Sequence, residues 1–447
     1  MNTKRFFELT GIFLAVALIM FIMYRFVNTQ LTEDVSIDMQ AVVIFDEASC
    51  VACHQKNATF LFYTGIPFFG EKINKGFSRF DIGDNLDKLK KGEAINEVCL
   101  SKIEMATLFN HFMPPAYFYL THWGASITPP KQTALKNWAK KHRTQFYSSN
   151  EVASRFQYDP VRPVPSSMAV DQQKAMLGKI LFHDTRLSAD NTISCASCHQ
   201  PDNGGANHFQ FATGAGKRLG TLNTPSLYNA YFQIAQSWDG HAVTLHEIIK
   251  EHITDALIMG NQSFAEVMDK LQSERQLGLV LGNNLTEDNI TDAIAEFVKS
   301  RLTPDCRFDA YLKGDENAIN HTEITGYTLF KLKKCAICHA GMTLGGQSFE
   351  LMGIYKDYFH DRGWDILKED RGRFNVTADE HDRHRFKVPG LRNVALTKPY
   401  FHDGSRQSLV DAVQIMGTYQ SNQSLTDDET SSIVAFLETL TADPPLN

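Results

Sequence analysis

The sequence has no long run of lysine and arginine, and its formal net charge is only −7 over 447 residues. Proteins that bind nucleic acid usually carry a basic face or stripe, so the composition argues against a nucleic-acid partner. Signals for β-strands are also few along the chain. With 43% hydrophobic residues, a chain of this length can fill the cores of two or three globular domains.

The amino-terminal region contains a stretch without any charge, residues 9–24 (LTGIFLAVALIMFIMY), which follows Lys4 and Arg5. A run of this length, extended a little past Arg25, can just span a bilayer. A cleaved signal peptide is the alternative, but the run is longer than usual and no small-x-small cleavage site follows it. We therefore expect residues 1–28 to form a single-pass anchor in the inner membrane, with the bulk of the chain in the periplasm.

Six of the eight cysteines lie in three copies of one pattern, C-x-x-C-H. This spacing is typical of a covalently attached c-type haem, with both thiols bonded to the porphyrin and the histidine on the iron. One copy alone could be a thioredoxin-like redox pair or half of a zinc site, but no second cysteine pair completes a zinc tetrahedron. The motifs are Cys50, Cys53 and His54; Cys195, Cys198 and His199; and Cys335, Cys338 and His339. We therefore predict three covalently bound haem c groups.

Two cysteines, Cys99 and Cys306, lie outside the three motifs. Haem c is attached outside the cytoplasm, where the compartment is oxidising, so this pair could form a disulfide. The two residues could equally be free buried thiols. Sequence alone does not distinguish these alternatives, because connectivity cannot be deduced from spacing.

The three motifs divide the chain into three haem domains. Helical periodicity ends each of them, at residues 134–146, 289–302 and 427–440, and a stretch rich in proline and serine separates the first from the second. The predicted fold class is mainly α, with three cytochrome c-like haem domains after an N-terminal transmembrane helix. The predicted boundaries are 1–28 for the anchor, 29–42 for a tether, 43–148 for the first haem domain, 149–167 for the linker, 168–310 for the second haem domain and 311–447 for the third.

Each haem iron has a second face, opposite its histidine, where a methionine or histidine can bind. In the first domain Met113 lies in HFMPPAYF, where two prolines exclude a helix interior. A thioether on such a loop is typical of electron-transfer cytochromes, although Met113 could also be a core residue. In the third domain we favour Met416 over His402 on the same ground. Both haems are then closed and suited to electron transfer.

The second domain lacks such a methionine. None occurs between His199 and residue 255, and the next, Met259, lies beside a glycine. A glycine-rich run at 212–220 would let the backbone pass close to a bulky group without ligating it. We hypothesise that the His199 iron is open, or closed only by water, and binds a small oxidant. The histidines of this region are His208, His241, His246 and His252.

Four long motifs resemble those of the bacterial di-haem cytochrome c peroxidases, a resemblance that covers nearly all of residues 168–441. The anchor and the first haem domain are similar to the tri-haem, membrane-bound quinol peroxidases of that superfamily. The resemblance implies that hydrogen peroxide is reduced at the His199 haem. Electrons would come from membrane quinol or a small cytochrome, through the first haem and then the third. The four motifs are residues 177–199, 223–230, 237–245 and 386–405.

Further site residues are implied by the resemblance. Trp238 resembles the tryptophan that lies between the two haems of the family. Asn223, Thr397 and the carbonyl of Pro399 match the family's calcium ligands, and hard oxygen donors of this kind suit Ca²⁺. Many di-haem members carry a distal histidine that must leave before peroxide can bind. The aligned residue here is Ala215, which implies that the site needs no reductive activation.

The chain also departs from the family. Ile248 and Ile258 stand where the family has a glutamine and a glutamate, and the family's arginine after W-D-G is replaced by a histidine. The glutamate is the expected general acid-base group, and losing such a group typically costs about 10² to 10⁴ in rate. A helix over 246–258 would bring titratable side chains within one turn of both isoleucines. The candidate substitutes are His241, Asp255 and His252.

Three functions are compatible with these residues. The first is a membrane-tethered peroxidase. The second is a three-haem electron-transfer relay with a degenerate peroxidase site, which the two isoleucines would mark. The third is an oxidase of the MauG type that acts on another protein, although MauG carries tyrosine where Met416 stands here. The sequence leaves the quinone, the donor and the oligomeric state open, although homodimers are common among the di-haem relatives.

Overall fold

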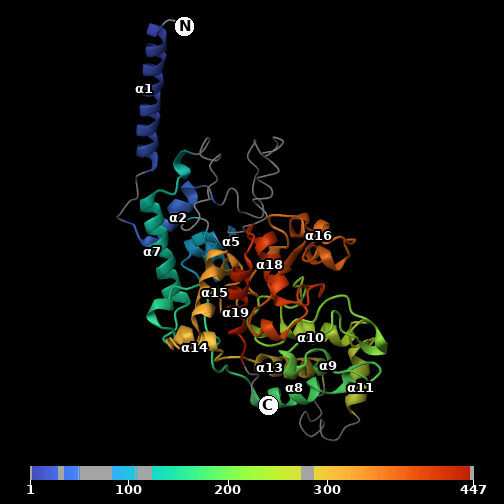
Figure 1. Cartoon of the computed structure of the whole chain (residues 1–447). Helices are drawn as coiled ribbons and strands as arrows, with labels where there is room; N and C mark the ends of the chain where they lie inside the picture. The colour runs from blue at the N-terminus through green and yellow to red at the C-terminus, as the bar shows by residue number, and fades with distance from the viewer. Residues whose placement is uncertain are drawn as a thin grey trace. The chain divides into compact units, whose positions relative to one another are not determined.

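The computed structural model describes residues 3–28, 35–48, 50, 83–105, 107, 123–272 and 286–442. In this part of the chain the fold is mainly α, as predicted (Figure 1). The same part contains a single sheet of two short antiparallel strands, β1 (Phe349–Leu351) and β2 (Arg385–Lys387). The chain divides into two compact units, Met1–Ser149 and Asn150–Asn447.

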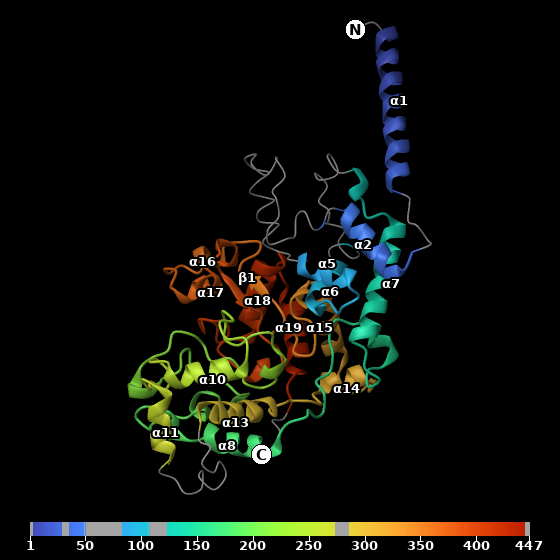
Figure 2. The same cartoon turned by 180° about the vertical axis from the view of Figure 1, so that it is seen from behind.

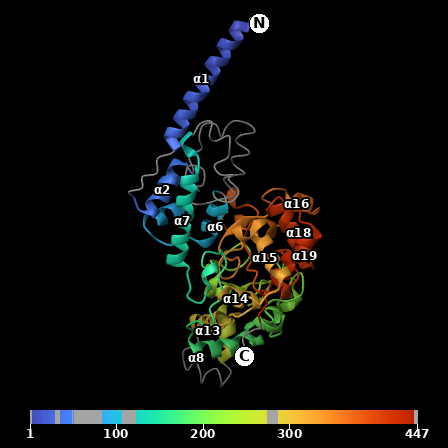
Figure 3. The ribbon, with the colours of Figure 1, turned by 60° about the vertical axis from the view of Figure 1, so that its left-hand side comes forward.

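The first unit has its core between α2 and α7, which lie side by side (Figure 3). Trp138 of α7 is fully buried and meets Phe45 of α2 edge-on, with ring centroids 5.5 Å apart. Across the residues whose side chains are described, no helix is both long enough and apolar enough to cross a membrane. The helices described in this unit are α1 (Thr3–Asn28), α2 (Ile37–Glu47), α5 (Gly83–Lys90), α6 (Glu97–Glu104) and α7 (Pro129–Phe146).

The second unit contains two helix crossings that resemble each other, because in each a glycine of one helix meets the backbone of the other. α8 packs against α13 (Figure 2), where a Cβ added to Gly178 would lie 1.9 Å from the carbonyl oxygen of Ala293. α15 packs against α19, where a Cβ at Gly326 would lie 1.9 Å from the carbonyl oxygen of Ser432. Glycine lets the two backbones touch at each crossing. Each crossing closes the core around one haem motif.

The helices of the second unit follow from caps and apolar spacing. α13, for example, begins after Thr286, whose side chain accepts a hydrogen bond from Asn289 N, and buries Ile290, Ile294 and Phe297 along one stripe. The helices predicted at the ends of the three domains are confirmed. The unit contains α8 (Gln172–Phe182), α9 (Cys195–Cys198), α10 (Leu245–Thr254), α11 (Phe264–Gln272), α13 (Glu287–Lys299), α14 (Arg307–Lys313), α15 (His321–Leu332), α16 (Tyr358–Asp361), α17 (Phe374–Thr377), α18 (Leu409–Gln420) and α19 (Asp427–Glu438).

The proline-rich segment before α8 packs onto the second unit. Val152, Phe156 and Val161 are buried in the core that surrounds the third haem motif. Val161 also forms an isolated bridge with Gly341, which lies two residues after that motif. The segment therefore belongs to the core of the third motif as well as connecting two parts of the chain.

Candidate active site and haem sites

The second and third motifs each begin with a short helical turn, α9 (Cys195–Cys198) and η10 (Cys335–Ile337). Residues three apart on such a turn lie on one face, so both sulfurs of a motif can reach one porphyrin. Burial raises the pKa of Cys195 and of Cys335 to about 12, so both are neutral thiols. The turns thus present paired thiols within the apolar cores of the second unit.

The histidines of both motifs point one ring nitrogen at a backbone carbonyl. Nδ1 lies 3.2 Å from the oxygen of Gly205 in His199 and 2.9 Å from that of Leu344 in His339. Burial lowers the pKa of both imidazoles and favours their neutral form. Because a carbonyl only accepts, Nδ1 carries the hydrogen and Nε2 keeps its lone pair for a metal. Two thiols and an imidazole in this tautomer fit a c-type haem.

The cysteines outside these two motifs are only partly described. Cys50 is half-buried and packs against the core of the first unit. Cys99 is buried in that core, and Cys306 is a buried free thiol in the second unit. Burial raises the pKa of Cys306 to about 11. The remaining predicted ligands of the first haem, Cys53, His54 and Met113, lie outside the described residues.

The two candidate sixth ligands of the third motif have different surroundings. Met416 lies on α18 and packs, half-buried, against a cluster of buried side chains that Trp238 also contacts. His402 is buried, and its Nε2 lies 2.8 Å from Oδ1 of Asp370. A carboxylate therefore occupies the histidine nitrogen that would bind a metal. The buried cluster consists of Met352, Tyr358, Phe359 and Phe386.

The glycine-rich run at 212–220 lies against the segment that follows α10. The amide of Ala215 donates to the carbonyl of Ile258 at 2.7 Å. Gly214 permits this approach, since a Cβ there would lie 2.0 Å from the carbonyl oxygen of Leu257. The backbone contact brings together Ala215 and Ile258, the two positions where the chain differs from the family in its distal histidine and its glutamate.

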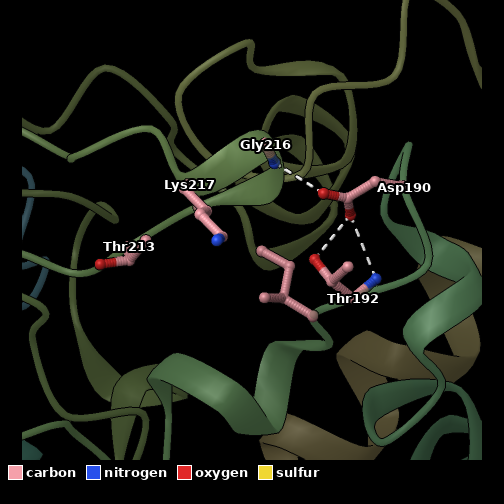
Figure 4. Close-up of a pocket in the computed structure, with 7 residues that line it drawn as sticks. Asp190, Thr192, Thr213, Gly216 and Lys217 are labelled. Carbon is pink, nitrogen blue, oxygen red and sulfur yellow. Dashed lines mark hydrogen bonds between the residues drawn. The ribbon is translucent and has the colours of Figure 1, made fainter.

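A pocket opens beside this loop, and Asp190 is hydrogen-bonded to other residues that line it. The Asp190 carboxylate accepts hydrogen bonds from Gly216 N at 2.6 Å and from Thr192 Oγ1 at 2.7 Å (Figure 4). These bonds, the one from Thr192 first, lower the pKa of Asp190 to about 2, so it stays ionised. The pocket lies beside the loop that carries Ala215. Its lining consists of Asp190, Thr192, Ile193, Thr213, Gly214, Gly216 and Lys217.

His241, a candidate acid-base group, is held between two carboxylates. Its Nδ1 lies 2.6 Å from Oδ1 of Asp239 and its Nε2 lies 2.9 Å from Oε2 of Glu251. Hydrogen bonding to Asp239 raises the pKa of His241 and favours the imidazolium form. Both ring nitrogens are therefore engaged in this arrangement. His208 and His246 are exposed.

Asp255, another candidate, ends a helix rather than continuing one. The helix expected over 246–258 is wrong for its last four residues, since α10 ends at Thr254 and Asp255 is extended. The Asp255 carboxylate accepts a hydrogen bond from Leu257 N at 2.7 Å and so caps the following turn. Asp255 and Ile258 consequently do not share a helix.

His252, the third candidate, lies on α10 one turn after Ile248, as expected. Burial, followed by the proximity of His199 and His241, lowers the pKa of His252 to about 3. The imidazole is thus neutral at physiological pH and belongs to the same group of histidines as the second motif. Of the three candidates, His241 is paired with carboxylates and Asp255 caps a turn, whereas His252 makes neither kind of interaction with the described residues.

Trp238 is hydrogen-bonded on two sides. Its indole Nε1 donates to the carbonyl of Asn223 at 2.8 Å, and its own carbonyl accepts from Lys387 N at 2.8 Å. Two residues beyond each partner stands a proline, Pro225 on one side and Pro389 on the other. Trp238 therefore joins two short segments that are far apart in sequence.

The two prolines connect these segments to the haem motifs. Burial lowers the pKa of both motif histidines, whereas the backbone of Pro225 beside His199 and of Pro389 beside His339 acts in the opposite direction and raises it. A three-residue segment on each side thus links Trp238 to one motif histidine. The sequence motifs did not show that Trp238 joins these two segments, because each of its hydrogen bonds is a tertiary contact.

One predicted calcium ligand, Asn223, is hydrogen-bonded to Trp238 through its backbone carbonyl. Asn223 is buried, and its Nδ2 donates to the carbonyl of Phe209 at 3.2 Å, so its Oδ1 is the atom suited to a cation. The amide of Asn223 also donates to the carbonyl of His402 at 2.8 Å, which places it beside the turn that carries Thr397 and Pro399. Oxygen donors from these two segments can meet there.

Sequence reasoning missed a buried charged cluster next to this turn. Ligand atoms of Asp370, His402 and Asp403 lie within 4.8 Å of one another. Arg362 bridges the two carboxylates at 2.6 and 2.9 Å, so their charge is already balanced by a guanidinium. Burial alone would raise the pKa of Asp370, but hydrogen bonds from Arg362 and His402 hold it well below its usual range. In the sequence, this cluster was indicated only by the two adjacent titratable residues of HDGS, His402 and Asp403.

Known proteins resemble this chain along most of its length. The profile of di-haem cytochrome c peroxidases matches residues 172–317, and that of a haem-binding domain matches residues 15–141. A cytochrome c peroxidase of Escherichia coli (strain K12) is 39% identical over 402 residues, which cover 88% of this chain and 86% of that protein. A cytochrome c551 peroxidase of Nitrosomonas europaea is 40% identical over 293 residues, 64% of this chain and 85% of that protein.

Solved structures agree in fold. A MauG-like protein associated with microbial copper homeostasis superposes with a TM-score of 0.56 at 24% identity, over 67% of this chain and 95% of that one. The Escherichia coli relative extends the similarity through both compact units at an identity that establishes common descent. The chain therefore belongs to the di-haem cytochrome c peroxidase family and is an oxidoreductase of that family.

Proposed function

We propose that this protein is a tri-haem peroxidase of the membrane-anchored quinol peroxidase type, which reduces hydrogen peroxide to water at the His199 site. The observation that carries the proposal is the position of Trp238, which is hydrogen-bonded to the segments that begin at Asn223 and Lys387. Pro225 ends one segment beside His199, and Pro389 ends the other beside His339. The names of the relatives, cytochrome c peroxidase and cytochrome c551 peroxidase, support peroxide as the oxidant and a cytochrome as a donor.

The residues divide the work between the sites. A haem c bound at each motif supplies redox-active iron, for electron storage at His54 and His339 and for peroxide reduction at His199. The carbonyl of Gly205 orients the His199 ring and increases its basicity as a ligand. Ala215 offers only a methyl group, which could not ligate the iron of a haem at the second motif. Met416, which packs with Trp238 against one cluster, would hold the iron of a haem at the third motif together with His339.

The membrane anchor, the quinol donor and the periplasmic location are part of the proposal. α1 is a continuous helix of 26 residues, and it carries the uncharged run of the sequence. A row of exposed large apolar side chains of this kind marks a surface that meets a membrane or another protein. The match of a haem-binding profile to the region that follows supports a third haem. Exposed apolar residues of α1 include Ile12, Phe13, Leu18, Phe21 and Phe26.

Calcium completes the proposed cofactor set. Asn223 Oδ1, an oxygen of Thr397 and the carbonyl of Pro399 are hard oxygen donors, which Ca²⁺ prefers. Asn223 also holds Trp238 through its carbonyl, so a cation there would stiffen the segment between the two motif histidines. The nearby Arg362 cluster is a less suitable cation site, because its guanidinium already neutralises the carboxylates.

The alternative is a three-haem electron-transfer relay. Two observations favour it. Ile258 cannot transfer a proton, and the candidate substitutes His241 and Asp255 are already held, His241 by two carboxylates and Asp255 by a turn. Mixing the fully reduced protein with peroxide under anaerobic stopped-flow conditions separates the two. A peroxidase oxidises its haems at a rate proportional to peroxide concentration, and replacing Cys195 and Cys198 by serine abolishes this reaction. Haems that stay reduced in the unmodified protein identify a relay.

A further inference from the structure

Lys387, the last residue of β2, is a buried cation without a counter-ion. Its side chain is buried, with 6% of its surface exposed. Nζ donates a hydrogen bond to Oε1 of Gln233, a neutral amide. Among the described residues no aspartate or glutamate forms an ion pair with Nζ, and burial lowers the pKa of Lys387 to about 8. A buried ammonium is costly unless an anion neutralises it.

The surroundings of this ammonium are fixed. Gln233 is wedged against the turn at Gly346, where an added Cβ would lie 2.7 Å from Cγ of Gln233, and Ile234 N donates to the carbonyl of Gly346 at 2.9 Å. An ammonium has three N–H donors, and in the described part of the chain only Gln233 accepts from it. Two donors thus remain for a ligand that carries acceptor oxygens.

The position of Lys387 in the fold indicates which molecule could supply these acceptor oxygens. Its amide donates to the carbonyl of Trp238, and the backbone of Pro389, two residues later, lies beside the ring of His339. Lys387 therefore lies on the segment that joins Trp238 to the third haem motif. Haem carries two carboxylate side chains at its periphery, and each needs a donor when it is buried. No carboxylate of the described protein competes for this site.

We propose that the ammonium of Lys387 binds a carboxylate of the haem held by Cys335, Cys338 and His339. This inference rests on the proposed function only in that a haem occupies the third motif. The pair neutralises a charge that would otherwise be buried alone. It also ties the haem edge to the segment bonded to Trp238. Replacing the lysine by a neutral residue leaves the haem carboxylate unpaired, which favours the oxidised, more positive haem.

The test compares redox titrations of the holoprotein with the wild-type chain and three variants. Lys387→Met removes the charge, Lys387→Arg retains it, and Lys368→Met removes a charge from an exposed lysine as the control. We expect Lys387→Met to lower the ratio of reduced to oxidised low-spin His339 haem about tenfold at a fixed potential, equivalent to a shift of about 59 mV. The arginine variant and the control should titrate like wild type. The propionate bending band in the resonance Raman spectrum should shift in Lys387→Met alone.

Unchanged potentials and an unchanged Raman band in Lys387→Met overturn the proposal, as does a shift confined to the His199 haem. If the methionine variant does not fold, Lys387→Gln, which keeps a polar partner for Gln233, is measured in the same way. Peroxide turnover is not a readout. A wild-type protein whose mass shows no haem at the third motif contradicts the proposed function instead, before Lys387 is tested.

Discussion

Three histidines around the second motif hold their protons differently because their neighbours differ. The His199 ring is kept neutral by burial and donates to a carbonyl. His252 is neutral because burial and two nearby imidazoles lower its pKa to about 3. His241 lies between two carboxylates that raise its pKa. Neighbouring titratable groups whose pKa values are shifted in opposite directions are typical of sites that move protons.

The raised pKa of His241 predicts a pH dependence of stability. A group whose pKa is higher in the folded state stabilises fully below its unfolded pKa of about 6.5, and this contribution disappears as the pH rises through the folded value. Since the His241 side chain is 30% exposed, we expect roughly 1 kcal/mol from it. His241→Gln should therefore lower the melting temperature at pH 5.5 and leave it unchanged at pH 9. A difference that is equal at both pH values contradicts the assignment.

Ile258 tests whether the protein lacks an acid-base group. Ile258 is half-buried against the same core as Cys195, so a carboxylate placed there would lie in an apolar setting that raises its pKa. We expect Ile258→Glu to accelerate peroxide reduction by about 10²-fold, the lower end of the usual contribution of acid-base catalysis. Ile258→Gln is the matched control, with similar size and no proton to transfer. Equal rates in all three proteins would mean that another residue, such as His252, already does this work.

At the scale of elements, each half of the second unit depends on one close helix crossing. Gly178 on α8 meets α13, and Gly326 on α15 meets α19, at the same separation. Both crossings close a core around a C-x-x-C-H motif. The repeated construction explains why two motifs 140 positions apart, Cys195 and Cys335, have similar surroundings.

The crossing at Gly178 predicts a stability effect. A methyl group there would overlap the carbonyl of Ala293, and overpacking of this kind typically costs about 1–3 kcal/mol. We expect Gly178→Ala to lower the melting temperature of the second unit by about 5 °C, measured by calorimetry of the holoprotein. Gly11→Ala is the control, because nothing lies within 4 Å of an added Cβ on α1. Equal melting temperatures for the two variants would show that the helices separate without cost.

At the scale of the whole molecule, the proposed anchor and the catalytic unit are separable. α1 ends at Asn28, whereas the motifs at His199 and His339 lie in the unit that begins at Asn150. We expect a chain in which a cleavable signal peptide replaces residues 1–28 to be recovered from the periplasmic fraction and to keep peroxide turnover with a chemical donor. Its activity with quinol in membranes should be lost. Recovery of the full chain from the same soluble fraction would contradict the anchor.

Features confined to a short stretch were predictable from the sequence. C-x-x-C-H places its three groups within about one turn, and helices with regular apolar spacing appear where expected, as in α13 and α19. The helix predicted over 246–258 was only partly right. Its end depends on the backbone of Asp255 and on a turn cap, which the apolar pattern does not encode.

The sequence by itself determined the three C-x-x-C-H motifs, the mainly α fold and the family, because each depends on residues whose spacing along the chain is also their spacing in space. The tertiary structure decided which distant residues meet: Trp238 with Lys387, His402 with Asp370, and His241 with Glu251. These contacts set the proton states and the buried charges. They cannot be obtained from local spacing, since each is made only when separate helices and loops pack together.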